Sequence, residues 1–418
     1  MREIFSLHLG QAGLGLGSAC WDLLALETGL SLEEMWTQLP DHSLRPRALF
    51  IDSDPASGDA LRASSLGERL ETGQIVAGEG DLGGVYQWSR VKLIAERSVE
   101  SMRKELEKCS NLQGFIVFHA LAGGTGTALS ELLLAHLKAS SPKATIHTLN
   151  VFPCNLQEES VVSPYNALLS AHSLLERADI SFFVDNKGLG GIAKAVFGTA
   201  SVPYSCLNQI MAQAYGALTA NMRFSSSFNA DLSEFVVNFV TYPRFHSCLL
   251  NHAPYFSSLH PYHPVLSTSE LFTRVFHPLS CLSSCSQVSG LYMTCGLHLR
   301  GSLSLVEALA AAHCLTSSHS IHYVDWSPET IRCGVVQERA AAVLGSGLEA
   351  GAETGLAVVN STAVREMYGR VGKQGERMLG KRACWHWYER EGVEIGEMAE
   401  AVESVKALVE DYKEVERH

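Results

Sequence analysis

The chain has 418 residues, of which 46% are hydrophobic, so it holds enough apolar material for the cores of two or three domains. This composition excludes a disordered chain and a disulfide-rich scaffold. Lys and Arg number 32 against 44 Asp and Glu, and the formal net charge of −12 argues against a surface that binds nucleic acid.

The first half of the chain alternates short apolar runs with segments of helical spacing. The apolar runs predict strands at residues 4–9, 48–52, 115–118, 145–152 and 180–185. Apolar residues three and four positions apart predict helices at residues 18–26, 91–109 and 129–137. Alternation of this kind is typical of a parallel sheet with helices on both faces.

The pattern changes after about residue 224. Residues 245–300 are rich in Ser, His, Pro and Cys, which predicts short strands and long loops. A further strand is expected at residues 321–324. In the final segment, 389–418, apolar residues recur three and four positions apart opposite acidic ones, which predicts an amphipathic helix with a solvated acidic face.

Cysteine usage and one uncharged stretch bear on the cellular location. The eleven cysteines form no CxxC pair, so we expect reduced thiols in a cytoplasmic protein. Residues 195–222 carry no charge, but Pro203 and several amide side chains interrupt them. This stretch therefore predicts a buried helix rather than a membrane span.

Two glycine-rich turns each lie between an expected strand and an expected helix. The first occupies residues 10–17 and the second residues 122–128. Backbone N–H groups at such helix starts can bind phosphate oxygens. Taken alone, the first turn is equally well explained as a simple tight turn. The second adds the hydroxyl groups of Thr125 and Thr127, but no Lys follows as it would in a Walker A loop.

Asp52 and Asp54 end the second expected strand. Carboxylates there, beside two phosphate-type turns, indicate a nucleotide bound with Mg²⁺, although a turn with helix capping explains them equally well. A dinucleotide-dependent oxidoreductase is a weaker alternative. It needs an acid about twenty residues after the first turn, and Asp52 lies much farther along the chain.

Taken together, the motifs of this chain resemble the tubulin family. They share one register from end to end, at residues 1–13, 19–21, 112–115, 118–119, 123–126, 184–186, 242–244, 324–326 and 381–388. Three features resemble the α rather than the β subunit: Gln11, Glu234 and the full-length loop around residues 343–356. The chain is identified as a divergent α-tubulin-like member of the family.

The resemblance implies an α/β fold with three domains. These are a Rossmann-like, parallel-sheet GTP-binding domain at 1–224, a smaller α/β intermediate domain at 225–362 and a C-terminal helical hairpin at 363–418. It also implies a GTP site with Mg²⁺ near Asp54. Asn186 and Asn208 would hydrogen-bond guanine, and Tyr204 would stack on it. The implied nucleotide-binding residues are Gly10, Gln11, Ala12, Asp54, Gly123, Gly124, Thr125, Gly126, Thr127, Glu159, Asn186, Tyr204 and Asn208.

Glu234 is the implied catalytic residue. In α-tubulins, this carboxylate helps to position the water that attacks the γ-phosphate held by the adjacent β subunit. Asp231 would support the same loop. From the residues alone, both acids equally serve as the start of a helix. The nucleotide of the chain's own site would be sealed and not hydrolysed, so whether this chain is itself an enzyme stays open in a family of GTPases.

Several positions depart from the family. Ala122 and Ala128 replace glycines, and the added methyl group forbids the turn if φ must be positive. Gly84 stands where an Asn would contact phosphate, while Glu159 and Ser163 replace residues of the ribose loop. We expect guanine recognition to be retained and the phosphate and ribose contacts to be weakened.

Two functions stay open. The first is a structural subunit that pairs with β-tubulin into GTP-binding heterodimers and polymerises into cytoplasmic microtubules. Its partners would be longitudinal and lateral tubulin neighbours, with motors and microtubule-associated proteins on the C-terminal helices. The second is a polymer-incompetent tubulin-like protein that regulates or sequesters β-tubulin and binds nucleotide weakly.

Overall fold

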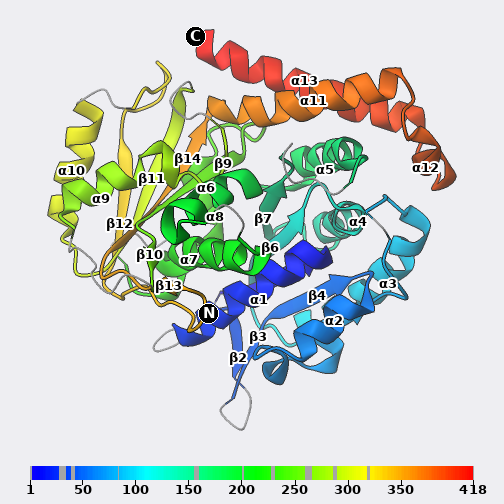
Figure 1. Ribbon diagram of the computed structural model, residues 1–418, viewed down its shortest axis with the longest axis horizontal. Coiled ribbons are helices and arrows are strands. Elements are labelled where there is room, and N and C mark those ends of the chain that lie inside the picture. The colour runs from blue at the N-terminus through cyan, green and yellow to red at the C-terminus, as the bar shows by residue number, and fades with distance from the viewer. Residues whose placement is uncertain are drawn as a thin grey trace. The chain divides into compact units, whose positions relative to one another are not determined.

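The computed structural model is shown in Figure 1. It describes residues 2–27, 34–38, 43–82, 84–154, 160–199, 202–226, 231–258, 266–285, 290–317 and 321–417. The chain divides into two compact units. The first comprises Met1–Ser18, Leu32–Ser181 and Arg365–Asp411, and the second comprises Ala19–Ser31, Phe182–Val364 and Tyr412–His418.

The first unit is built on parallel strands in the order β5-β4-β1-β6-β7. The strands are β1 (Glu3–Leu9), β4 (Ala48–Asp52), β5 (Ile75–Ala77), β6 (Leu112–Ala120) and β7 (Thr145–Phe152). Every residue of β1 is buried, as expected of a central strand covered on both faces. Leu7 is in register with Leu49 on one side and Val117 on the other, so apolar side chains line up across the sheet.

Helices connect these strands, as the alternation predicted. They are α1 (Gly10–Leu26), α2 (Pro55–Arg62), α3 (Trp88–Leu106), α4 (Gly124–Ser140) and α5 (Ser163–Arg177), with short 3₁₀ turns η1 (Gly67–Arg69) and η2 (Thr72–Gln74). α4 packs against both α3 and α5. The strands therefore end in turns that lead directly into helix N-termini.

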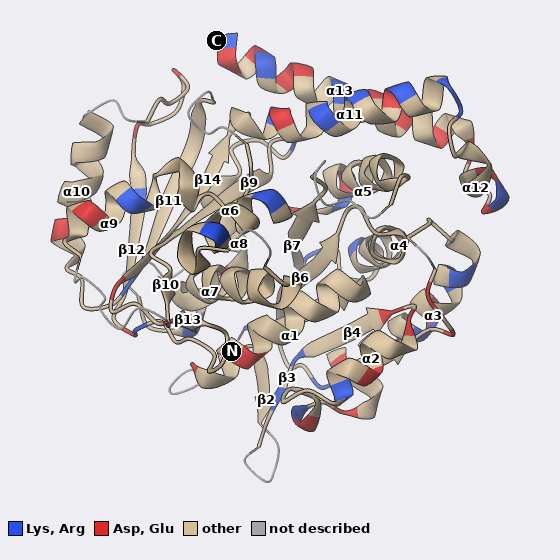
Figure 2. Ribbon diagram, viewed as in Figure 1, with Lys and Arg blue, Asp and Glu red and all other residues tan. Residues whose placement is uncertain are grey.

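Three helices close the chain: α11 (Arg365–Gly380), α12 (Trp385–Arg390) and α13 (Ile395–Arg417). α11 packs on α5. Lys406 of α13 pairs with Glu376 of α11 at 2.6 Å, and Val405 lies against Gly372. Figure 2 shows acidic and basic residues interspersed along both helices. This is the predicted C-terminal helical region.

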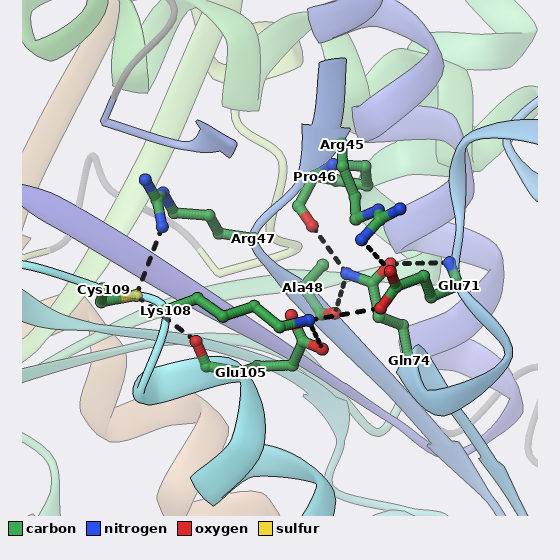
Figure 3. A network of polar contacts seen from close by, with 9 residues as sticks. All are labelled: Arg45, Pro46, Arg47, Ala48, Glu71, Gln74, Glu105, Lys108 and Cys109. Carbon is green, nitrogen blue, oxygen red and sulfur yellow. Dashed lines mark hydrogen bonds and ion pairs between the residues drawn. The ribbon is translucent and has the colours of Figure 1, made fainter. Parts of the chain in front are cut away.

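A polar network fastens the small hairpin of β2 (Trp36–Gln38) and β3 (Leu44–Pro46) to its own unit (Figure 3). Arg45 of β3 pairs with Glu71, which also accepts from Lys108 Nζ at 3.2 Å. The buried Gln74 donates from Nε2 to the carbonyl oxygen of Pro46 at 2.7 Å. The exposed ion pairs add little stability, whereas the buried amide bond holds the hairpin in register.

The second unit contains strands in the order β8-β9-β14-β11-β12. They are β8 (Ile180–Asp185), β9 (Ser247–Ala253), β11 (Tyr292–Arg300), β12 (Ile331–Val336) and β14 (Thr354–Ser361). β14 is antiparallel to β9 and β11, whereas β11 and β12 are parallel. A separate short pair joins β10 (Phe256–Ser257) to β13 (Leu348–Glu349).

The helices of the second unit include α7 (Tyr204–Arg223), most of whose residues are buried. The others are α6 (Asn186–Phe197), α8 (Leu232–Phe239), α9 (Thr268–Val275) and α10 (Leu305–Ser317), with 3₁₀ turns η3 (Pro278–Ser280) and η5 (Thr362–Val364). α7 lies in the uncharged stretch 195–222 and begins directly after Pro203, because proline cannot continue a helix that arrives from upstream. No helix in the described part of the chain is long and apolar enough to cross a membrane.

The α/β class and the parallel sheet are confirmed, but three local predictions are wrong. Residues 10–17 belong to α1 rather than to a turn, and Gly10 alone, with φ of +70°, makes the turn. Of the second glycine-rich segment, residues 122–128, only the first two precede the helix, because α4 begins at Gly124. Residues 321–324 form no strand: Tyr323 makes an isolated bridge to Tyr292, and the strand lies instead at β12. Polar Arg332 and the glycine of β12 concealed it from a search for apolar runs.

Candidate functional site

Three strand-end turns converge in the first unit. β1, β4 and β6 are parallel neighbours, so their carboxyl ends meet at one edge of the sheet, where ligands of such sheets bind. A Cβ atom built on Gly10 would lie 3.3 Å from the backbone nitrogen of Gly126. The hydroxyl groups of Ser53 and Thr125 are 2.8 Å apart. The turns after β1, β4 and β6 therefore contact one another.

The start of α4 offers backbone donors. The first turn of a helix leaves its N–H groups without intrahelical acceptors, and Gly123, the N-cap of this 17-residue helix, supplies no side-chain cap. Open space surrounds the position where a Cβ atom of Gly123 would lie. Uncapped N–H groups facing such space suit an anion. Thr127 is turned inward instead, because its buried hydroxyl donates to the Leu121 carbonyl at 3.1 Å.

The two acids after β4 have different environments. Asp54 caps α2, accepting from Ala56 N at 3.0 Å, so the capping explanation holds for this residue. Asp52 is only 4% exposed, and its Oδ2 has no hydrogen-bond partner among the described residues. Burial raises the pKa of Asp52. A buried carboxylate oxygen without a hydrogen-bond partner can bind a cation or the water that the cation carries. These residues therefore fit a nucleotide–Mg²⁺ group.

The two alanines of the second turn fit without strain. In the described part of the chain, non-glycine residues with positive φ are Arg382 and Cys384, so Ala122 and Ala128 keep ordinary backbone angles. Gly84 does have a positive φ of +73°, which glycine adopts without cost. The substitutions by alanine thus leave the turn geometry available.

Asn186, Tyr204 and Asn208 lie in the second unit. Asn186 opens α6, directly after Asp185, whose carboxylate accepts from Gly188 N and from the backbone of Ser284. Tyr204 opens α7, and Asn208 lies one turn later on the same face. Tyr204 is 52% exposed, so part of its side chain is accessible to a ligand. Glu159 lies outside the described residues.

Glu234 is exposed near the start of α8. Its Oε2 accepts from Asp231 N at 3.4 Å, which is the capping contact expected of the third residue of a helix. The carboxylate is therefore at the surface of its unit, with lone pairs left over for solvent or a partner.

The sequence did not reveal one residue beside the site. Asn166 is fully buried in α5 and donates to the carbonyl oxygen of Ala122, in the turn before α4, and to that of Gly84, in the turn before α3. A polar residue between the apolar Tyr165 and Ala167 was the available signal, because buried amides are uncommon and are nearly always hydrogen-bonded.

Adjacent glycines of the second turn give a matched pair of substitutions. A Cβ atom on Gly124 would lie 2.3 Å from the Val85 carbonyl oxygen, so the backbone must shift. We expect Gly124→Ala to lower the free energy of unfolding by about 1–3 kcal/mol, as in other overpacked sites. Gly123→Ala, in open space, should change it by less than about 0.5 kcal/mol. Urea unfolding of both variants checks this, and equal losses would contradict the crowding.

Comparison with known proteins agrees with these features. Residues 3–194 match the family described as Tubulin/FtsZ family, GTPase domain, and residues 243–373 match the Tubulin C-terminal domain. The tubulin alpha chain of Trypanosoma cruzi is 35% identical, covering 99% of this chain and 96% of the relative. The tubulin alpha-1B chain of Physarum polycephalum and the tubulin alpha-3 chain of Zea mays are each 34% identical, covering 99% of this chain and 97% of each relative.

Proposed function

The chain belongs to the tubulin family as a divergent α-tubulin-like member, and from this premise we propose that it pairs with β-tubulin in a GTP-binding heterodimer that enters cytoplasmic microtubules. A GTPase-domain match over residues 3–194 implies GTP binding. The single observation that carries the proposal is the meeting of three strand-end turns. They meet beside the uncapped start of α4 and beside Oδ2 of Asp52, which has no hydrogen-bond partner among the described residues.

The proposed roles follow the placement of each residue. Residues 10–12 and 123–127 bind the phosphates through backbone N–H groups, and Thr125 adds its hydroxyl. Asp54, joined by Asp52, holds Mg²⁺, and the bound ion would neutralise phosphate charge. Asn186 and Asn208 recognise guanine, Tyr204 stacks on it, and Glu159 belongs to the ribose loop. The proposed domains are 1–224, 225–362 and 363–418.

The proposed partners follow from the same premise. Longitudinal and lateral tubulin neighbours would contact the chain in the polymer, and motors and microtubule-associated proteins would bind the charged outer helices α11 and α13. Glu234 would act across the longitudinal contact, where its exposed carboxylate orients a water for attack on the neighbour's γ-phosphate. The chain's own GTP would not be turned over.

Nucleotide content tests the proposal. The chain is co-expressed with β-tubulin, the complex is purified and denatured, and released guanine nucleotide is measured by chromatography. Two nucleotides per heterodimer are expected. One per intact heterodimer would mean that this subunit's site is empty and would favour the sequestering protein instead. No heterodimer at all would overturn the proposal.

Substitution of Glu234 by Gln separates catalysis from folding. Gln keeps the length and the capping oxygen at this helix position but loses the charge that orients water. We expect polymer-coupled GTP hydrolysis to slow by about a hundredfold, while binding of GTP is unchanged. Single-turnover phosphate release during assembly measures this.

Glu270→Gln is the matched control. Glu270 is also an exposed capping glutamate at the third residue of a helix, where it accepts from Ser267 N at 2.9 Å in α9. Its substitution repeats the chemical change without touching the proposed attack on GTP. Equal hydrolysis rates in the two variants would show that Glu234 only caps α8.

A further inference from the structure

Asn166 joins two turns at the proposed phosphate site. Its Nδ2 donates to the carbonyl oxygen of Gly84 at 3.0 Å and to that of Ala122 at 2.8 Å. Gly84 lies in the turn before α3, and Ala122 lies in the turn before α4. These turns also touch directly, because Gly124 lies against the Gly84–Val85 backbone. One amide group thus fixes the spacing of two segments that precede different helices.

The other end of the amide is held by α12. The hydroxyl of Tyr388 donates to Oδ1 of Asn166 at 2.7 Å, and its alternative acceptor, the Val162 carbonyl, is more distant at 3.4 Å. Backbone carbonyls only accept hydrogen bonds, so Nδ2 must face Gly84 and Ala122 and Oδ1 must face a donor. Tyr388 is that donor. The two carbonyls exclude the flipped amide, because it would place an oxygen against both of them.

Tyr388 is itself fixed by aromatic packing. It is fully buried, stacks with Trp385 and Tyr86 at centroid distances of 6.0 and 6.1 Å, and meets Tyr165 edge-on at 5.3 Å. Trp385 and Tyr388 belong to α12, whereas Tyr86 precedes α3 and Tyr165 lies in α5. The position of the hydroxyl therefore depends on how α12 packs.

We propose that Asn166 is a positioning residue that sets the geometry of the two phosphate-facing turns, and that Tyr388 couples this geometry to the packing of α12. We call the hydrogen bonds that join Asn166 to Tyr388 and to the two turns the clamp. The identity of the ligand rests on the function proposed above, but the clamp does not. Coupling is reciprocal, so bound GTP would protect α12, and any partner that shifts α12 would alter the two turns.

The chain offers a closely matched control. Tyr165 is buried in the same aromatic cluster, but its hydroxyl has no hydrogen-bond partner among the described residues. Tyr388→Phe and Tyr165→Phe therefore remove the same atom from neighbouring rings, and only the first breaks the clamp. Amide hydrogen exchange is followed in peptides covering residues 80–88 and 120–128, on the full chain in complex with β-tubulin.

We expect Tyr388→Phe to speed amide exchange in both peptides by about three- to tenfold, the effect of one lost hydrogen bond. Tyr165→Phe should leave both unchanged. Asn166→Ser shortens the side chain so that it no longer reaches the two carbonyls. It should reproduce the exchange pattern of Tyr388→Phe. Exchange at the wild-type rate in both turns of Tyr388→Phe would overturn the clamp, and so would equal effects of the two tyrosine variants. If the purified wild-type complex holds no guanine nucleotide in this subunit, the proposed ligand is overturned. The exchange comparison still tests the clamp in that case.

Discussion

Replacing Glu27 by Gln is expected to lower the free energy of unfolding of the second unit by about 3–5 kcal/mol, because two buried guanidinium groups would lose their counter-charge. Glu27 Oε1 lies 2.7 Å from Arg300 Nη1, and Oε2 lies 2.7 Å from Arg223 Nη2. All three side chains are 5% exposed or less. Burial alone would raise the pKa of Glu27, but the two arginines outweigh it and hold the pKa below its usual value.

The triad also anchors a loop. Arg300 donates from Nη2 to the Arg339 carbonyl at 2.9 Å, and Ala341 N donates to Glu27 Oε1 at 3.1 Å. These contacts fix the start of the loop around residues 343–356, the segment that resembled α-tubulins in the sequence. Loss of the carboxylate should therefore loosen this loop before the rest of the unit, since its anchors are charge-assisted.

Urea unfolding measures the effect, and Glu100→Gln is the control. Glu100 pairs with Arg103 at 2.9 Å, but both side chains are about half exposed, so this substitution should lower the free energy of unfolding far less. A loss of similar size in the two variants would show that the buried triad contributes no more than a surface ion pair.

Sequence patterns predicted β1, β4, β6, β7 and β8 because a buried parallel strand is apolar along its whole length, but they did not place the remaining strands. They misassigned residues 10–17, since glycine there has a different purpose. A Cβ atom on Gly13 would lie 2.6 Å from the Phe118 carbonyl, and one on Gly17 would lie 2.3 Å from the His8 ring. The glycines let α1 approach the sheet closely, a packing requirement that a local pattern cannot distinguish from a turn.

The sequence predicts the strand-end turns of the candidate site but not the buried side chains that hold them in place. Strand ends are visible in the sequence, and parallel topology brings them to one edge. The bonds from Asn166 reach back 82 and 44 residues, and that from Arg300 to Glu27 spans 273. Without an established topology, no pattern of spacing could pair these residues. At position 166 the sequence shows only a polar residue between two apolar ones, and the burial that gives it meaning is a structural observation.

Acidification below pH 6.5 is expected to destabilise both units strongly, because four fully buried histidines are neutral in the folded chain. Burial lowers the pKa of His8 and His252 to about 3 and that of His119 and His298 to about 4. The unfolded chain, with pKa near 6.5, therefore binds more protons between pH 6.5 and 4. Stability is fully present above pH 6.5 and falls as the pH drops towards the folded pKa values.

Each of these histidines contributes about 1.4 kcal/mol per pH unit in that window, so two in one unit remove about 7 kcal/mol between pH 6.5 and 4, comparable with the stability of a typical domain. Urea midpoints measured from pH 5 to 8 report the slope. His119→Gln should reduce the slope of stability against pH by the contribution of one bound proton. His386→Gln, at an exposed position, should leave the slope unchanged. A slope that His119→Gln does not alter would mean that this imidazole is already protonated in the folded chain. The stacking of His8 between Phe50 and Phe118, at 4.5 Å from each ring, argues for the neutral form, since that sandwich excludes the water a charged ring needs.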